Sequence, residues 1–347
     1  MTEASARLPT ITGQGLEVRL SRRATDTVSP DCFEVVEVDV AEPGPGQVVV
    51  RNLIMSVDPY MLSRLVPLRG AAPAFEVGRA LDGDAVGVIV ESADDTLARG
   101  QYVLHRAGFR EWATLAASDV TVIDITDVSP SAYLGVLGMP GFTAWVAARL
   151  IAIFRAGESV LVTAGAGAVG TTYTQLARFA DCRVVCSVGN DDNGRRLVDE
   201  LGADAWFNYR DGPFTDLAIA ALPEGADLAL DNIGGAQLRD MIEVMRPQGR
   251  IVMCGSAALY GPNTPPISFE ARQLIQLVSR RLTLRGFTYP DHLAAHRDFR
   301  AEMSELLSSG AIVNAETVVN GLDRAVEAML GIFTGTPHFG KLIVDVS

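Results

Sequence analysis

The stretch Ser159-Val-Leu-Val-Thr-Ala-Gly-Ala-Gly-Ala-Val-Gly170 decides the fold of the chain. Its first half is a short apolar run rich in β-branched residues, which predicts a buried parallel strand. Its second half carries glycines in the spacing G-x-G-x-x-G. Apolar residues then recur on one face of a 3.6-residue period, at Val169, Tyr173, Leu176, Ala177 and Ala180. The stretch therefore predicts a strand, a glycine turn and a helix.

Glycine lets the backbone turn tightly and approach a pyrophosphate, whose charge is held by the free N–H groups and the positive dipole end of the following helix. A chain with 33 glycines also produces this spacing by chance, so the alternative is a purely structural turn. Because a predicted strand precedes the motif and a predicted helix follows it, we favour a dinucleotide site. Its residues are Gly165, Ala166, Gly167, Ala168, Val169 and Gly170.

The whole chain sets further limits. A length of 347 residues exceeds the size at which single cores usually stop growing, so we expect two domains. A net charge of −13 argues against nucleic acid or an anionic membrane surface as a partner. The N-terminus has no apolar signal segment, and no stretch is long enough for a membrane span. The four cysteines show no C-x-x-C spacing, which favours a reduced, cytoplasmic protein.

Residues 16–60 alternate between apolar and polar positions, and short strands closed by glycine turns continue through 85–104, which predicts a β-rich, barrel-like N-terminal domain. From Ser129-Pro130 onward helical runs alternate with apolar strands, which predicts a doubly wound parallel sheet over 131–311. A last strand, Lys341–Val346, follows a helix around 321–334 and fits either domain by its periodicity. The expected strands are 159–164, 183–188, 227–231, 250–254 and 282–287, and the expected helices are 169–180, 193–201, 235–246 and 269–280.

Six motifs in order resemble one family. They are Met55-Ser-Val-Asp-Pro-Tyr-Met61, Leu134–Ala144, Ala166–Gly170, Asp231-Asn-Ile-Gly-Gly235, Arg250–Gly255 and Leu284-Arg-Gly-Phe287. They resemble the zinc-independent medium-chain dehydrogenase/reductases, in particular the prostaglandin reductases, leukotriene B4 12-hydroxydehydrogenases, alkenal double-bond reductases and curcumin reductases. The resemblance implies an α/β fold with a GroES-like catalytic domain, 1–130 completed by 312–347, and an inserted Rossmann domain. It also implies a homodimer.

A metal centre is not expected from the sequence. Zinc alcohol dehydrogenases share this fold, but their sites need Cys, His or carboxylate ligands at set spacings, and the four cysteines and four histidines are scattered. The pair His292 and His296 has no third ligand in view, and a solvated helix face explains it. No Ser-His-Asp or Cys-His grouping is present either, so a cofactor must supply the reactive hydride.

Two tyrosines are the candidate catalytic residues. Reduction of an activated alkene leaves negative charge on the carbonyl oxygen, and a neutral tyrosine can donate a hydrogen bond there at pH 7. Tyr60 ends the motif Asp58-Pro-Tyr60, and Tyr260 lies beyond the carboxyl end of a predicted Rossmann strand. In the resembled family both positions line the substrate site. The alternative for each is a core or interface tyrosine with a satisfied hydroxyl.

The choice between NADPH and NADH depends on the end of the second Rossmann strand. An NAD site usually has an acid there, but Cys186-Ser-Val-Gly189 has none, which favours the 2′-phosphate of NADPH. The family's lysine a few residues on is replaced by Asn193, beside Asp191 and Asp192. Tyr209 keeps the family's second phosphate contact, and replacement charge is available from Arg195, Arg196 and Arg210. We expect NADPH, with NADH as the alternative.

The resemblance adds further cofactor-binding positions to this set. One is His338 in Pro337-His338-Phe-Gly-Lys341, which replaces a family asparagine after a one-residue insertion, although a surface histidine is the default interpretation of this residue. The others are Ser187, Asn232, Cys254, Gly255, Tyr260 and Phe287.

The resulting expectation is an NADPH-dependent reductase of the carbon–carbon double bond in α,β-unsaturated ketones or aldehydes. Zinc-independent quinone reduction and a non-catalytic NADPH-binding protein are the alternatives. The pocket walls are expected from loops such as Leu65–Phe75 and Leu259–Ser268, whose sequences do not name a substrate.

Overall fold

The computed structural model describes residues 10–11, 13–24, 27–65, 73–260 and 271–347. The chain divides into two compact units. The first contains Met1–Leu134, Val318–Leu330 and Leu342–Ser347, and the second contains Gly135–Thr317 and Gly331–Lys341. The expected domains placed 131–134 with the second unit and all of 312–347 with the first, whereas 131–134 belong to the first unit and residues 312–317 and 331–341 belong to the second.

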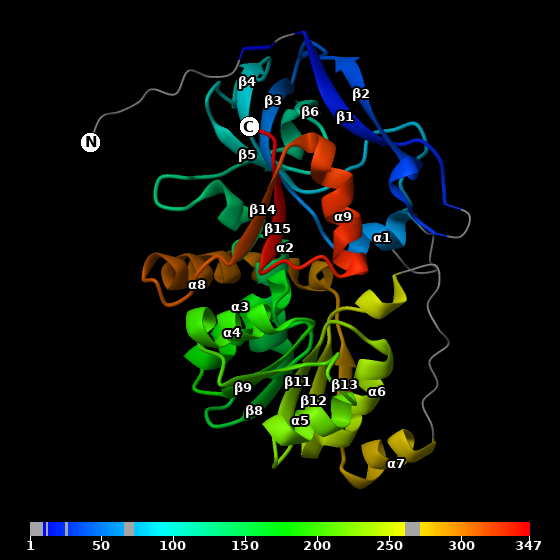
Figure 1. The fold of residues 1–347 in the computed structure, drawn as a ribbon. Helices are drawn as coiled ribbons and strands as arrows, with labels where there is room; N and C mark the ends of the chain where they lie inside the picture. The colour runs from blue at the N-terminus through cyan, green and yellow to red at the C-terminus, as the bar shows by residue number, and fades with distance from the viewer. Residues whose placement is uncertain (1–9, 12, 25–26, 66–72, 261–270) are drawn as a thin grey trace. The chain divides into compact units, whose positions relative to one another are not determined.

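The first unit is built on a sheet, labelled in Figure 1, in which β15, β3, β4, β5, β6 and β7 pair antiparallel. Its strands run in the order β14-β15-β3-β4-β5-β7, with β6 paired to β3, and β1 and β2 form a separate antiparallel pair. The bounds are β1 Gln14–Leu20, β2 Phe33–Asp39, β3 Gln47–Ser56, β4 Ala85–Ser92, β5 Tyr102–His105, β6 Trp112–Ala116, β7 Thr121–Val122, β14 Glu316–Asn320 and β15 Lys341–Asp345, with helices α1 Tyr60–Leu65 and α9 Ala325–Thr334.

Successive valines of β3 explain the packing of this sheet. Val48 and Val50 belong to one apolar cluster and Val49 to another, because neighbouring side chains of a strand point to opposite faces. Both faces of β3 are therefore covered. The last strand, β15, pairs antiparallel with β3, so Ile343 lies opposite Ser56. This pairing places the final strand in the β-rich sheet, a question that periodicity had left open.

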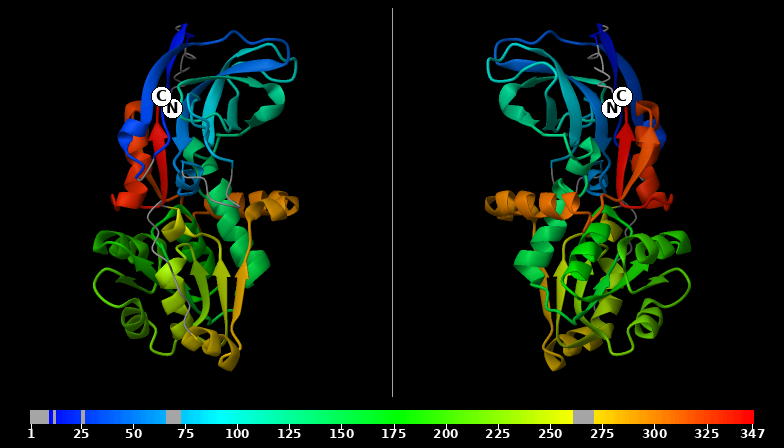
Figure 2. Two further views of the ribbon diagram at one scale, coloured as in Figure 1. Left: turned by 90° about the vertical axis from the view of Figure 1, so that its right-hand side faces the viewer. Right: turned by 90° about the vertical axis from the view of Figure 1, so that its left-hand side faces the viewer.

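The second unit is a six-stranded parallel sheet with the order β10-β9-β8-β11-β12-β13. Figure 2 shows these strands side by side, with helices on both faces. The strands are β8 Ser159–Val162, β9 Arg183–Val188, β10 Ala205–Asn208, β11 Ala226–Asp231, β12 Met245–Met253 and β13 Thr283–Gly286. The helices are α2 Met139–Val146, α3 Ala168–Phe179, α4 Asp191–Leu201, α5 Phe214–Ala221, α6 Gly235–Val244, α7 Ala271–Ser279 and α8 His296–Ser308.

The order of these strands creates a switch point at β8. From β8 the chain passes through β9 to β10 on one side, then returns to β11 on the other side of β8 and continues outward. Adjacent loops therefore leave the carboxyl ends of β8 and β11 in opposite directions, and a crevice for a ligand forms there in open α/β sheets. One face of the sheet is covered by α5 and α6, whose apolar residues share one cluster with the strands.

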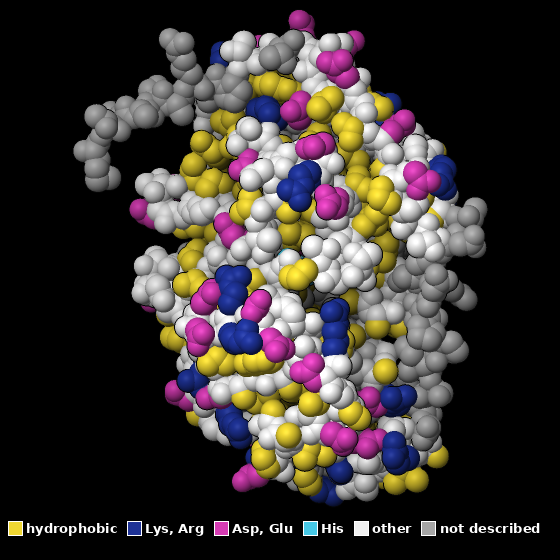
Figure 3. All heavy atoms as spheres, in the orientation of Figure 1, with side chains coloured by type: hydrophobic (Ala, Val, Ile, Leu, Met, Phe, Trp, Pro, Cys, Tyr) yellow, Lys and Arg dark blue, Asp and Glu magenta, His cyan; other side chains and the backbone are white. Residues whose placement is uncertain are grey.

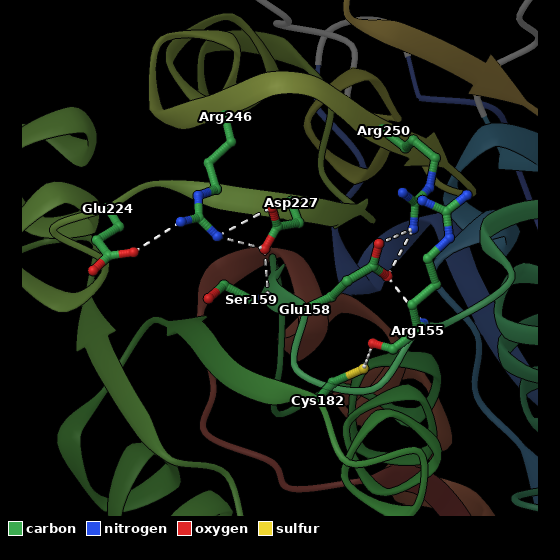
Figure 4. A network of polar contacts seen from close by, with 8 residues as sticks. All are labelled: Arg155, Glu158, Ser159, Cys182, Glu224, Asp227, Arg246 and Arg250. Atoms are coloured by element: carbon green, nitrogen blue, oxygen red, sulfur yellow. Dashed lines mark hydrogen bonds and ion pairs between the residues drawn. The ribbon is translucent and has the colours of Figure 1, made fainter.

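The opposite, amino-terminal edge of the same sheet is closed by ion pairs, drawn in Figure 4. Arg250 contacts Glu158 at 2.8 Å, and Arg246 contacts Asp227 at 3.0 Å and Glu224 at 2.8 Å. The same Asp227 accepts a hydrogen bond of 2.9 Å from the backbone of Ser159. These pairs tie the starts of β8, β11 and β12 together at the edge away from the glycine loop.

Candidate functional site

The glycine loop joins β8 to α3 as the sequence predicts. The Gly165 N–H donates to the Ser187 carbonyl on the neighbouring β9, at 3.1 Å, which anchors the start of the turn. A side chain at Gly170 would begin 2.4 Å from the Ala164 carbonyl oxygen, so glycine is required for the helix to pack this closely. Ala164 takes a positive φ of 47°, which is uncommon outside glycine and marks the sharpness of the turn.

Gly167 has a different role in the same loop. It is the N-cap residue of α3, and no side chain caps this helix among the described residues. A side chain at Gly167 would meet only the Ala164 carbonyl oxygen, at 3.3 Å. The first N–H groups of α3 therefore face a space that no side chain enters from this position, as an anionic ligand at a helix N-terminus requires.

A partly buried polar network lies at the carboxyl ends of β8, β11 and β12. Thr163 receives a hydrogen bond of 2.9 Å from the Asn232 N–H, and the Asn232 side chain donates back to the Thr163 carbonyl at 2.7 Å. The Cys254 thiol donates to the Asn232 side-chain oxygen at 2.8 Å. A side chain at Gly255 would begin 2.6 Å from the Asn232 carbonyl oxygen. Three of the predicted positions are thus brought together and fixed.

The Asp231 carboxylate holds the backbone that carries this network. It accepts hydrogen bonds from the Ile233 and Gly234 N–H groups, the latter at 2.9 Å. Burial raises the pKa of Asp231, and the backbone hydrogen bonds oppose that rise. The bonds to Asp231 hold Gly234 at a positive φ of 72°, from which α6 starts. The motif Asp231–Gly235 is therefore a rigid turn beside the glycine loop.

Residues 335–340, here called the strap, lie against the glycine loop. The Gly340 N–H donates to the Ala166 carbonyl at 2.8 Å, and Gly340 forms a parallel bridge with Gly167. Gly340 must be glycine, because it has a positive φ of 71° and a side chain would begin 1.9 Å from the Ala315 carbonyl oxygen. These contacts explain why residues 331–341 belong to the second unit. The family-like Phe-Gly-Lys was the one sequence signal for this contact.

Helix α4 holds the strap from its other side. The Asn193 side-chain amide donates to the His338 carbonyl at 2.8 Å. The Arg196 guanidinium lies 3.9 Å from the centre of the Phe339 ring. Burial lowers the pKa of His338, and a hydrogen bond with the Thr336 backbone opposes that shift. Asn193, expected at the position of the family lysine, thus uses its side-chain amide to bind another segment of the same chain.

The residue directly after β9, the second Rossmann strand, lies against the Tyr209 ring. A side chain at Gly189 would begin 3.3 Å from the ring and hydroxyl of Tyr209, so this glycine makes room for the ring. Sequence reasoning missed Gly189 as a site residue, although its position directly after the apolar run of β9 could have indicated it. Ser187 is fully buried, and its hydroxyl has no partner within the described part of the chain.

The two candidate tyrosines lie in different units. Tyr60 begins α1 in the first unit, and burial followed by the charges of Asp58 and Asp84 raises its pKa. Tyr260 follows the short turn Ala257–Leu259 after β12, and burial raises its pKa as well. Both hydroxyls therefore stay protonated at neutral pH and can donate hydrogen bonds. The Phe287 N–H bonds to the Met253 carbonyl at 3.4 Å, just beyond β13.

Other sequence expectations concern what surrounds the site. Segments 66–72 and 261–268 of the loops expected to line the pocket lie outside the described residues, as do residues 269–270 at the start of the expected helix 269–280. Among described residues, no group of three or more His, Cys, Asp and Glu side chains could hold a metal ion. Acidic and basic side chains are interspersed over the face shown in Figure 3. Within the described chain, no helix is both long and apolar enough to cross a membrane.

Comparison with known proteins places this architecture among the oxidoreductases. Residues 17–123 match the model described as the N-terminal domain of oxidoreductase, and residues 168–309 match the model described as zinc-binding dehydrogenase. A parallel Rossmann sheet with a glycine loop, beside a separate β-rich unit, defines the class of two-domain dehydrogenases and reductases.

Named relatives narrow the class. The chain is 30% identical to the NADPH-dependent curcumin reductase of Escherichia coli, over 94% of this chain and 96% of the relative. It is 32% identical to the 2-alkenal reductase (NADP(+)-dependent) of Nicotiana tabacum, over 88% of each. The solved structure of CurA from Vibrio vulnificus in complex with NADPH has a TM-score of 0.88 and 26% identity, over 96% of this chain and 99% of that one. The chain belongs to the zinc-independent group of the medium-chain dehydrogenase/reductase family.

Proposed function

We propose that the protein is an NADPH-dependent reductase of the carbon–carbon double bond in α,β-unsaturated ketones or aldehydes. The observation that supports this best is the uncapped N-terminus of α3 beside Gly167 at the switch point of the sheet. The residues present fit a dinucleotide there, because the glycine loop leaves open the space that a pyrophosphate needs. Bound NADPH would supply a hydride equivalent to the substrate.

The names of the relatives agree with this cofactor. The curcumin reductase is NADPH-dependent, the 2-alkenal reductase is NADP(+)-dependent, and the CurA structure holds NADPH. Curcumin and 2-alkenals both contain a double bond conjugated to a carbonyl group. A conjugated double bond is the chemical feature that the substrates of these two relatives share, so we extend it to this chain.

The protein's own groups have two tasks in this reaction. When hydride reaches the β-carbon, negative charge develops on the carbonyl oxygen, and a preorganised hydrogen-bond donor there lowers the barrier. Tyr260 or Tyr60 supplies that donor, since burial keeps both hydroxyls protonated. The rigid turn around Asp231 and the Asn232–Cys254 contact hold the backbone at the carboxyl ends of β11 and β12, where they would support the nicotinamide of a bound cofactor.

The test is an assay of NADPH oxidation with a simple enone, a 2-alkenal and a quinone, followed by analysis of the products. With NADPH deuterated at the transferring position, we expect deuterium on the β-carbon of a saturated carbonyl product. Turnover of the quinone alone would favour the quinone oxidoreductase instead. Nucleotide binding without turnover of any of the three would favour a non-catalytic protein.

We also propose that the protein is a cytoplasmic homodimer. All four cysteines are free thiols, as a reducing compartment maintains them. Strand β13 ends the parallel sheet, and α7 exposes Leu274, Ile275 and Val278, the last with 79% of its surface accessible. An open sheet edge beside exposed apolar side chains suits a self-complementary contact.

A further inference from the structure

Three arginines are near enough in sequence to the end of β9 to read the 2′-phosphate of NADPH. In the structure the three arginines differ in the side chains that each already contacts. We propose that Arg210 holds the 2′-phosphate, and that Asn193, in the position of the family lysine, serves to fasten the strap. This inference rests on the proposed function, because it assumes that the glycine loop binds NADPH.

Two of the arginines are committed to carboxylates of their own helix. Arg195 lies 2.5 Å from Asp192 and 3.9 Å from Asp191. Arg196 makes two contacts with Glu200, at 2.6 and 3.0 Å, and stacks on the Phe339 ring. A phosphate would have to compete with these carboxylates for either guanidinium.

Arg210 is in a different position. Within the described chain its side chain has no carboxylate within ion-pair distance, and its guanidinium lies 5.7 Å from the centre of the Tyr209 ring. Tyr209 in turn covers Gly189 at the end of β9, where the adenosine ribose of a Rossmann cofactor lies. An unpaired guanidinium beside this ring can bind a phosphate with two parallel hydrogen bonds.

The loop that carries Arg210 is held by polar contacts. The Asn208 side chain donates to Asp191 at 3.0 Å and accepts the Arg210 N–H at 3.2 Å. Asp191 therefore has Asn208 and Arg195 as partners, and the guanidinium of Arg195 offsets the negative charge of this carboxylate. On its far side, Arg210 reaches the backbone of Gly335 in the strap, where a side chain would begin 2.8 Å from the guanidinium.

Asn193 acts on the strap and not on the phosphate. Its amide is used by the His338 carbonyl, and its own N–H is used by Asn190, the N-cap residue of α4, at 2.9 Å. A neutral amide engaged in this way adds no charge for a phosphate. Its contribution is to keep the strap against the glycine loop. Because every dinucleotide would bind at that loop, this contribution is the same with and without a 2′-phosphate.

The experiment measures binding of two fragments that cannot react, ADP-ribose and 2′-phospho-ADP-ribose, by calorimetry with the full-length protein. We expect wild type to prefer the phosphorylated fragment. Arg210→Ala should weaken that fragment by about 10- to 100-fold and leave ADP-ribose unchanged, because one charge-assisted contact is lost. Arg195→Ala and Arg196→Ala serve as matched controls and should keep the preference within about threefold, since paired surface charges contribute little.

Asn193→Ala tests the second half of the inference, namely that Asn193 fastens the strap. It should weaken both fragments by the same factor, because the strap is loosened for either ligand. Loss confined to the phosphorylated fragment in Asn193→Ala, or in Arg195→Ala or Arg196→Ala, would overturn the inference. Equal binding of both fragments by wild type would also overturn it, whereas failure to bind either fragment would refute the proposed function itself.

Discussion

Tyr260 is a partly buried residue whose hydroxyl stays protonated at neutral pH, because burial raises its pKa. Removing one hydrogen-bond donor to a developing oxyanion typically lowers turnover by about 10²- to 10³-fold. We therefore expect Tyr260→Phe to reduce kcat on an enone by that factor, with unchanged NADPH affinity and melting temperature, because the ring is kept. Steady-state kinetics and cofactor titration measure both.

Tyr60→Phe is the comparison variant for this prediction. If the two hydroxyls act as one unit, each single variant will lose less, and the double variant will show a non-additive loss. Full turnover by Tyr260→Phe with a deficient Tyr60→Phe would transfer the role to Tyr60.

His105 gives the first unit a pH-dependent stability. It is 3% exposed, and burial followed by the charge of Arg110 lowers its pKa to about 3. In the unfolded chain its pKa is about 6.5, so the unfolded state takes up a proton first as the pH falls. The stabilising contribution of neutral His105 is thus complete above about pH 6.5 and is lost towards about pH 3, at about 1.4 kcal/mol per pH unit.

The variant that tests this is His105→Asn, whose side-chain oxygen can still accept the Ala107 N–H that now bonds to Nδ1 at 3.1 Å. Urea unfolding of both proteins at several pH values gives the difference in unfolding free energy. We expect wild type to lose stability relative to His105→Asn as the pH falls from about 6 to about 4. Parallel pH profiles would contradict the assignment.

At the scale of elements, two glycines at the start of α3 allow effects on folding stability to be separated from effects on NADPH binding. A side chain at Gly167 meets one carbonyl oxygen at 3.3 Å, whereas one at Gly170 meets backbone atoms at 2.4 and 2.8 Å. We expect Gly167→Val to fold and to lose NADPH binding, because its methyl groups occupy the approach of the pyrophosphate.

Gly170→Ala provides the contrast, since it should lower the melting temperature through a clash with the preceding turn. Circular dichroism melts and fluorescence titration with NADPH distinguish the two effects. Undiminished NADPH affinity in a folded Gly167→Val protein would remove the basis for the site.

The sequence predicted most of the Rossmann elements because long apolar runs and helical periodicity mark them. It missed β10 and the helices α2, α5 and α8. Strand β10 is the four-residue segment Ala205–Asn208, which is too short to show a period, and α5 has a predominantly apolar composition that reveals little of its helical face. Two tertiary contacts also had no local signal, namely that between Asn193 and His338 and that between Tyr209 and Gly189.

At the scale of the whole molecule, the exposed face of α7 next to β13 predicts a dimer. Multi-angle light scattering after gel filtration should give twice the chain mass of 37.0 kDa. Val278→Asp places a charge on a residue that is 79% exposed in the single chain. We expect this variant to shift the protein towards the monomer without loss of secondary structure, because a buried, unpaired charge disfavours the contact. A dimer unaffected by the substitution would place the interface elsewhere.

The bond between Ala166 and Gly340 also affects the order of events during biosynthesis. Ala166 lies near the start of the Rossmann unit in sequence, and Gly340 lies in the segment that returns to it. A ribosome makes the glycine loop long before it makes its strap. Any part of the Rossmann sheet that forms during synthesis therefore forms before the nucleotide site is complete, and a cofactor that binds the complete site stabilises the finished protein.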